Sequence, residues 1–167
     1  GSCQARRQVG DIALAVLQPC VPEDQVEPHT HDDAHLLLLL EGQYRSSAVG
    51  MPPQSNGATL ILNPPGTHHR DRFHGEGGRF FTISMPAARW DQAREQRDLA
   101  EFAHRLDGSA LAHAAALLHE LQRWDDLSPL AVQSSLELLL DETCIDARVQ
   151  SSGGPPWLER AREQLAD

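Results

Sequence analysis

The stretch "HTHDDAHLLLLLEG" (29–42) decides the fold, because it places a group of histidines directly before a run of five leucines. The leucines require burial, so the imidazoles are carried to the edge of a hydrophobic core. On an extended strand, His29 and His31 point to the same face because side chains alternate along the strand. The imidazoles therefore either form a hydrogen-bonded polar fringe or converge on a ligand.

Length and charge limit the classes of protein that this chain can represent. Its 167 residues and 18.4 kDa suffice for one domain with a sizeable core and an appendage. Lys and Arg number 14 against 24 Asp and Glu, which gives a formal net charge of −10. Such a surface mostly repels phosphates, so the chain itself is not expected to bind DNA.

Compartment and redox state are also indicated by composition. No stretch approaches the roughly 18 consecutive apolar residues that a membrane span requires, and no signal peptide is recognised, so we expect a cytoplasmic protein without membrane contact. The cysteines at positions 3, 20 and 144 are odd in number and lack a CxxC pattern. This excludes a disulfide framework or a zinc ribbon as the basis of the fold.

Short apolar runs separated by turn residues fill the first half of the chain. They predict an antiparallel β-sandwich or small barrel. Between two of the runs, "EGQY" suits a tight hairpin in which Gly42 adopts a positive φ. The runs span residues 9–17, 34–42, 43–50, 58–63, 68–74 and 78–85.

After Pro86 the apolar spacing becomes helical. Two helices are predicted from the spacing within 99–106 and 111–118, and a third begins at Ser128. The third helix has apolar residues on more than one face, which predicts that part of its surface meets a partner. The predicted dimerisation residues are Val132, Leu136, Leu139 and Leu140. Residues 150–156 read as a linker before the start of a last amphipathic helix.

A second histidine cluster, "PPGTHHRDRFH" (64–74), lies far along the sequence from the first. Alternation places His69, Asp71 and Phe73 on one face of a strand. Neutral imidazole is the commonest transition-metal ligand, so three or four histidines on adjacent strands could hold zinc, nickel, copper, iron or manganese. The alternative is that they are hydrogen-bonded residues at the rim.

The first cluster resembles the first sequence motif of the cupin superfamily of small antiparallel β-barrels. That motif is HxH, three residues, an acidic ligand, six residues and a glycine. His29, His31, His35 and Gly42 stand at these positions. Histidine in place of glutamate at 35 can still ligate, but it raises the charge of the site by one unit, which departs from the usual cupin enzyme chemistry.

The second cupin motif is matched as well. It consists of a glycine, PxG and a histidine, and Gly57, Pro64, Gly66 and His69 occupy these positions. Phe73 stands where this motif usually has asparagine. The resemblance implies that His69 faces the barrel interior, and together with the first motif it implies one metal site of His29, His31, His35 and His69, with zinc or nickel as the expected cofactor.

The order of barrel, helices and the tail "PPWLERAREQLAD" is similar to the amino-terminal sensing half of AraC-type transcription regulators. This resemblance implies a jelly-roll-like cupin barrel at 1–87, a helical dimerisation region at 88–149, and a linker with the start of a helix-turn-helix DNA-binding domain at 150–167. DNA would be bound only through that further domain. The expected unit is a homodimer.

The resemblance implies a cytoplasmic effector-sensing domain that binds a small molecule, a transition metal or both through the four histidines, and no enzyme. The alternative is a metal-dependent cupin enzyme, of dioxygenase or isomerase type. No catalytic residue is predicted, because Asp32 and Asp33 are adjacent and point to opposite faces of a strand. The sequence does not select the effector, the target genes or the sign of regulation.

Overall fold

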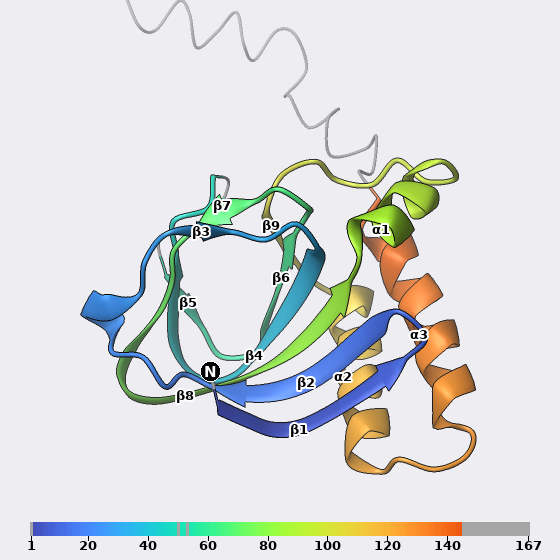
Figure 1. Ribbon diagram of the computed structural model, residues 1–167, viewed down its shortest axis with the longest axis horizontal. Coiled ribbons are helices and arrows are strands. Elements are labelled where there is room, and N and C mark those ends of the chain that lie inside the picture. Colours follow the sequence, from blue (N-terminus) through green and yellow to red (C-terminus); the bar gives the residue numbers. More distant parts are fainter. Residues whose placement is uncertain (1, 50, 53, 145–167) are drawn as a thin grey trace, which may run out of the picture.

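The computed structural model describes residues 2–49, 51–52 and 54–144, which form a curved antiparallel sheet covered by helices (Figure 1). The predicted linker and last helix at 150–167 lie outside the described residues. The strands are β1 (Ser2–Val9), β2 (Ile12–Gln18), β3 (His29–Thr30), β4 (Ala34–Ser46), β5 (Ser55–Asn56), β6 (Thr59–Asn63), β7 (His68–His69), β8 (Asp71–Met85) and β9 (His104–Leu106). The helices are α1 (Ala87–Arg94), α2 (Ser109–Gln122) and α3 (Ser128–Glu142), with a short 3-10 helix at Glu23–Gln25.

The main sheet has the strand order β1-β2-β8-β4-β6-β9, with β5 paired to β4, and all of its pairs are antiparallel. A separate two-stranded ribbon joins β3 to β7. The prediction of a mainly β, antiparallel fold is confirmed. The expected closed barrel is wrong for the described residues, because β1 and β9 remain as edges of the main sheet.

The strand β4 runs through the predicted hairpin instead of turning there. Its partner β8 follows it from Ala34↔Met85 to Ser46↔Asp71, with irregularities in register on both sides of Glu41. Gly42 has a φ of +97°, and a Cβ at this position would lie 2.9 Å from the carbonyl oxygen of Gly77. Gly42 is therefore required for a bulge that bends a continuous strand, because a side chain would collide with β8 backbone.

The two faces of the sheet bury different sets of side chains. On one face, Leu36 and Leu38 of β4 pack with residues of β6, β8 and the helices into the main core. On the other face, Leu37 and Leu39 form a smaller cluster with Tyr44. Alternation along β4 thus divides its run of leucines between two cores, which explains why the sequence is apolar at every position.

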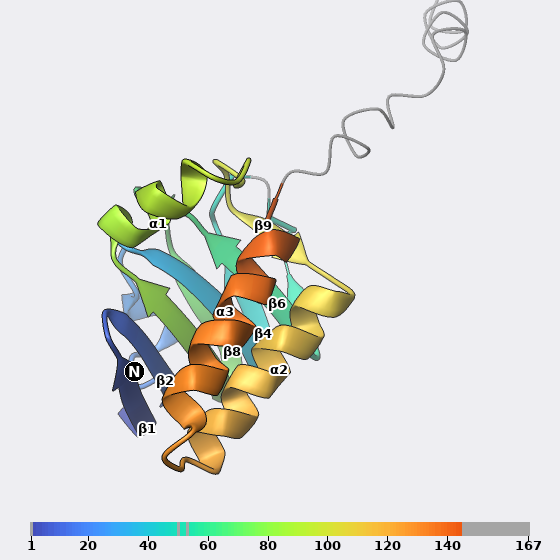
Figure 2. The ribbon, with the colours of Figure 1, turned by 90° about the vertical axis from the view of Figure 1, so that its right-hand side faces the viewer.

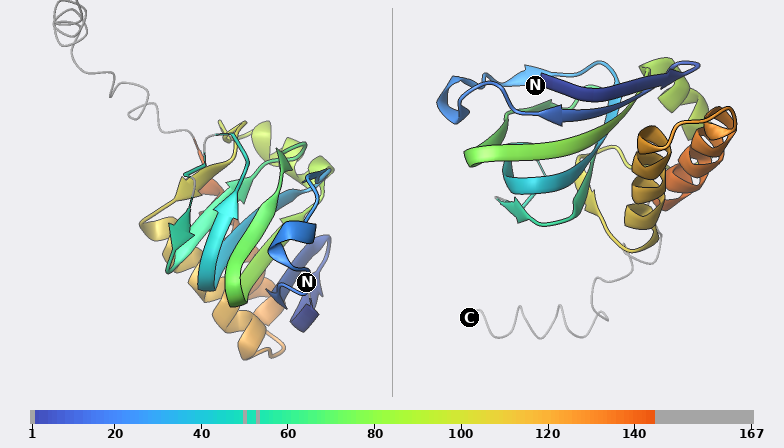
Figure 3. Two further views of the ribbon diagram at one scale, coloured as in Figure 1. Left: turned by 90° about the vertical axis from the view of Figure 1, so that its left-hand side faces the viewer. Right: turned by 90° about the horizontal axis from the view of Figure 1, so that it is seen from below.

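Helices α2 and α3 form a hairpin that covers the face with the main core (Figure 2). Figure 3 shows from below that both lie on the same face of the sheet. The predictions of these two helices are confirmed, whereas the prediction of a helix at 99–106 is wrong. Its last residues form β9, which pairs with β6, and Phe102 is exposed. The sheet therefore extends past the predicted boundary at residue 87.

The predicted dimerisation residues Val132, Leu136, Leu139 and Leu140 are buried within the chain, with at most 1% of each exposed. They pack into the main core on the side of α3 that faces the sheet and α2. Their assignment to a dimer seam is wrong because no partner can reach them. Among the described residues, no helix is long and apolar enough to cross a membrane.

Candidate functional site

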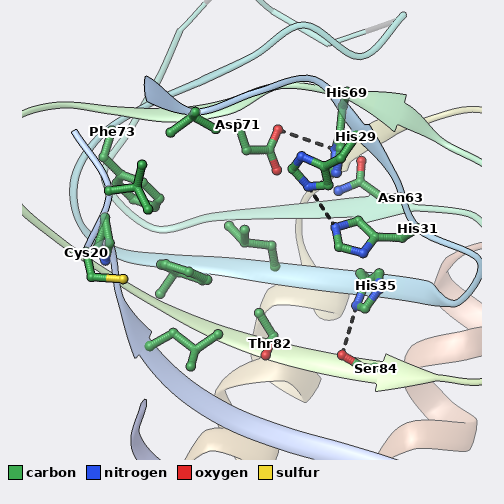
Figure 4. A pocket seen from close by; sticks show the side chains of 16 residues that line it. Cys20, His29, His31, His35, Asn63, His69, Asp71, Phe73, Thr82 and Ser84 are labelled. Carbon is green, nitrogen blue, oxygen red and sulfur yellow. Dashed lines mark hydrogen bonds and ion pairs between the residues drawn. The ribbon is translucent and has the colours of Figure 1, made fainter. Parts of the chain in front are cut away.

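A cavity of about 350 Å³ opens on the face of the sheet that carries the smaller core (Figure 4). Its two ends differ in chemistry. One end is polar and carries the histidines, and the other is lined by apolar side chains that include Phe73. The polar lining residues are His29, His31, His35, Asn63, His69, Asp71, Thr82 and Ser84. The apolar ones are Leu17, Pro19, Val21, Val26, Leu37, Phe73 and Phe80, beside Cys20.

The short ribbon of β3 and β7 brings the two distant histidine clusters together. His29 of β3 pairs in register with His69 of β7, and the amide of Gly66 donates to the carbonyl oxygen of His31 at 2.8 Å. The Nε2 atoms of His29 and His31 lie 3.0 Å apart, as their predicted common face requires. The ring centroids of His29 and His69 are 4.9 Å apart.

One ligand atom from each of His29, His31 and His69 lies within 4.8 Å of the others. His69 is 2% exposed, and neither of its ring nitrogens makes a hydrogen bond with a described residue. Its Nδ1 lies 3.4 Å from Oδ1 of Asp71, whose carboxylate accepts a hydrogen bond from the Ser46 hydroxyl at 2.8 Å. Buried polar atoms without hydrogen bonds are costly, so this geometry suits the binding of a ligand or a metal ion.

The fourth predicted histidine, His35, stands beside this group but is not part of it. Its ring lies 4.3 Å from that of His31, measured between centroids. Its Nδ1 is 2.8 Å from the hydroxyl oxygen of Ser84 on β8. This bond fixes the ring orientation and leaves Nε2 as the free nitrogen of His35.

Burial favours the neutral form of three of these histidines, His31, His35 and His69. Burial is the main cause that lowers the pKa of His35 from 6.5 to about 4, and the neighbouring His31 contributes to this shift. Burial also lowers the pKa of His31 and that of His69, while Asp71 partly offsets the effect at both. Neutral imidazoles keep a lone pair available, which is the form that binds a metal ion or accepts a hydrogen bond.

Alternation on β7 and β8 places the second cluster as predicted: His69, Asp71 and Phe73 all line the cavity. The sequence reasoning did not single out the polar lining residues Asn63, Thr82 and Ser84, or the ring of Phe80. A signal was present in "RFFTISM" (79–85), because alternation puts Phe80, Thr82 and Ser84 on one face.

The segment at residues 19–28, between β2 and β3, was also not predicted to line the cavity. It contributes Cys20, Val21 and Val26 to the apolar end. Glu23 fastens it to the sheet, since Oε2 of Glu23 lies 3.0 Å from Nδ1 of His74. This contact lowers the pKa of the Glu23 carboxyl.

A family model for AraC-like ligand binding domains matches residues 11–140, which is most of the chain. None of the curated proteins matches it significantly in sequence. The match therefore rests on the shared domain and not on a characterised relative.

Solved cupin structures are similar to half of this chain. A cupin-2 domain protein of Shewanella frigidimarina shares 15% identity at a TM-score of 0.42, covering 50% of this chain and 79% of its own. A cupin superfamily protein of Desulfitobacterium hafniense shares 13% at 0.43, covering 51% and 76%. Oxalate decarboxylase of Lactobacillus farciminis shares 19% at 0.38, covering 46% and 24%. At these values the likenesses say nothing about what this chain binds.

Proposed function

The chain belongs to the family of AraC-like ligand binding domains, and from this membership we propose that it is the effector-sensing domain of a transcription regulator. One observation carries the proposal. The cavity beside the sheet holds a nearly fully buried imidazole, His69, whose ring nitrogens make no hydrogen bond with a described residue, although Nδ1 lies 3.4 Å from the Asp71 carboxylate. A small molecule or ion that enters the cavity would satisfy them. DNA contact is assigned to a further domain of the regulator.

A divalent transition metal, zinc or nickel, would be held by His29, His31 and His69. Three neutral nitrogens within 4.8 Å of one another suit such an ion. When bound, the metal would supply a Lewis-acidic centre for a donor atom of the effector. His35 is held by Ser84 and lies outside this group, so we assign it to contact with the effector and not with the metal.

The lining of the cavity favours binding over catalysis. Of the described residues that line it, Asp71 is the only carboxylate, and it already accepts the Ser46 hydroxyl. A general base needs an available carboxylate or imidazole within reach of a substrate proton, and the remaining candidates are the histidines assigned to the metal and effector. The enzyme alternative therefore has less support from this site.

A continuous connection leads from the cavity to the helices. Ser84 of β8 lines the cavity, and β8 ends at Met85, directly before α1. Arg97, just beyond α1, donates to Glu137 of α3 at 2.8 Å and to Asp141 at 2.7 Å. An effector that binds one arrangement of β8 better than another would bias the position of α3 through this connection.

We further assign dimerisation to the outer side of α3. Leu127, Leu130 and Leu138 are 72%, 69% and 48% exposed, on or beside this helix. Leu127 and Leu138 are eleven residues apart, about three helical turns, so they share one side of the helix. Dimers are the usual state of proteins that read two-fold symmetric DNA sites.

Metal content tests the metal site. The protein is stripped with a chelator, offered zinc or nickel, and analysed for bound metal. We expect about one metal ion per chain in the wild type, and about tenfold less in His31→Ala because one of three ligands is lost. His119→Ala is the matched control, since this histidine is exposed on α2. Wild-type protein that binds no metal above background would restrict the site to an organic effector.

A further inference from the structure

The apolar end of the cavity is walled by two aromatic rings. Phe73 and Phe80 are stacked, with ring centroids 5.1 Å apart and an angle of 22° between their planes. Tyr44 packs against the edge of Phe73 from the smaller core, with centroids 5.4 Å apart. Phe73 and Phe80 are only partly buried, and both line the cavity. The arrangement offers a flat apolar surface to a ligand.

This wall is fixed by the backbone around it. A Cβ at Gly78 would collide with the ring of Phe73, so the ring rests on bare backbone that only glycine leaves free. Phe73 also stands where the resembling cupin motif usually has asparagine. The apolar wall is therefore a feature of this chain that the superfamily motif does not imply.

The polar end of the cavity carries no cationic side chain among the residues that line it. The chain has no lysine at all, and none of the arginines that the structure describes lines the cavity. The polar lining of the cavity consists of imidazole, amide, hydroxyl and carboxyl groups. The charged group at this end is the Asp71 carboxylate. A free carboxylate would enter without a partner of opposite charge, which is costly in a buried site.

We propose that the effector is an amphipathic molecule with a planar apolar ring system that stacks on Phe73 and Phe80 and a single uncharged hydroxyl or carbonyl head at the histidine end. The inference rests on the proposed sensing function and names its ligand class. A cavity of about 350 Å³ is near the lower limit for ligand sites, which suits one or two fused rings. A sugar suits the cavity less well, because each hydroxyl that it turns toward the apolar wall stays unpaired at a cost of about 1–3 kcal/mol.

Three probes distinguish the classes by isothermal titration calorimetry on the chelator-treated protein. 2-Naphthol carries two fused rings and one neutral hydroxyl, 2-naphthoate carries the same rings with a carboxylate, and D-xylose is a polyol without an apolar ring. We expect 2-naphthol to bind about tenfold or more tightly than 2-naphthoate, because the carboxylate loses its hydration without gaining a cation. D-Xylose should show no heat of binding at millimolar concentration.

Variants locate the ring. Phe73→Leu and Phe80→Leu should each weaken 2-naphthol binding about threefold to tenfold, which corresponds to the loss of one aromatic contact. Phe102→Leu is the matched control and should leave binding unchanged, since Phe102 is exposed and far along the chain from the cavity residues. Thermal unfolding of each variant shows whether it is folded, and two independent positions keep the test decisive if one variant is not.

The ligand class is overturned if D-xylose or 2-naphthoate binds the metal-free protein as tightly as 2-naphthol, or if neither phenylalanine variant weakens 2-naphthol. If D-xylose or 2-naphthoate binds as tightly and His31→Ala abolishes that binding, the cavity is still the effector site, but the effector is not of the proposed class. Added zinc tests the metal assignment separately: it should narrow the difference between 2-naphthoate and 2-naphthol in the wild type and not in His31→Ala.

Discussion

The two faces of β4 and β8 have opposite characters although they belong to the same strands. The face toward α2 and α3 is a closed apolar core in which every second residue is aliphatic or aromatic. The face toward the cavity combines apolar residues with histidine, serine and threonine. The core face carries Leu36, Leu38, Phe81 and Ile83, and the cavity face carries His35, Leu37, Phe80, Thr82 and Ser84.

This difference separates stability from function within one sheet. The core face buries apolar surface, which is the main source of folding free energy. The cavity face keeps polar atoms that make no hydrogen bond with a described residue, including both ring nitrogens of His69 and Oδ1 of Asn63. Such atoms reduce the stability of the free protein, and they gain hydrogen bonds when a ligand binds. One face of the sheet therefore stabilises the fold, while the other face is suited to binding a ligand.

The largest expected effect comes from Leu36→Ala on the core face. Leu36 is fully buried in the main core, so truncation leaves a closed cavity and should lower the free energy of unfolding by about 3–5 kcal/mol. Leu37→Ala removes the same atoms one residue away on the cavity face. Because Leu37 lines an existing cavity, only the transfer cost of about 2 kcal/mol is expected. Urea denaturation followed by circular dichroism measures both values.

Equal losses for Leu36→Ala and Leu37→Ala would break the comparison, because they would mean that the cavity face is as tightly packed as the core face. A larger loss at Leu37 would reverse it. The pair is well matched, since both positions lie on β4 and pair with β6 and β8 in consecutive register.

Much of this sheet follows from the sequence because alternation is a local property. The strands containing 34–40, 59–63 and 78–85 were predicted from apolar runs, and their pairing places each leucine on one of two faces. The neighbourhood of His29, His31 and His69 was also expected, since strand alternation and the resembling motifs agree on it. The ribbon of β3 and β7 brings these residues together across the chain.

The missed features depend on contacts between distant segments. At 99–106 the apolar spacing fits a helix, yet pairing with β6 converts 104–106 into an edge strand. The helical spacing of the apolar residues on α3 predicts that they are buried, but it does not show which part of the molecule covers them. In the structure α2 and the sheet of the same chain cover Val132, Leu136, Leu139 and Leu140. The segment at 19–28 covers the cavity through Glu23 and His74, which lie far apart in sequence.

Acid should weaken the cavity face selectively. The folded pKa of His35 is about 4, below its ordinary value of 6.5, so its contribution to stability is fully present above pH 6.5 and is lost as the pH falls from 6.5 to about 4. The loss from this residue is at most about 3.4 kcal/mol, at 1.36 kcal/mol for each unit by which the pKa is lowered. Burial lowers the pKa of His31 and of His69 as well, so both residues add to the loss of stability as the pH falls.

Urea titrations of the metal-free protein at several pH values measure this dependence, and His35→Gln should flatten it because glutamine does not titrate. The matched variant His113→Gln lies on α2 and should retain the wild-type slope. A slope unchanged by His35→Gln would show that the titration of His35 does not contribute to the acid sensitivity.

The smallest expected effect on stability is at the exposed leucines on the outer side of α3. Comparing them with a buried leucine of the same helix separates the effect of apolar character from the effect of burial. Leu130 is 69% exposed and Leu136 is fully buried on the same helix. The double substitution Leu130→Ser and Leu138→Ser should change the free energy of unfolding of the monomer by no more than about 0.5 kcal/mol per site. If this side of α3 is the dimer interface, the same substitution should shift the sedimentation mass from that of a dimer to that of a monomer. Leu136→Ser should instead unfold the domain, since it places a hydroxyl and a void in the main core. A dimer that survives the double substitution would exclude the outer side of α3 as the dimer interface. The contrast in stability between Leu130 and Leu136 would still show that burial, and not apolar character alone, decides which leucines stabilise this fold.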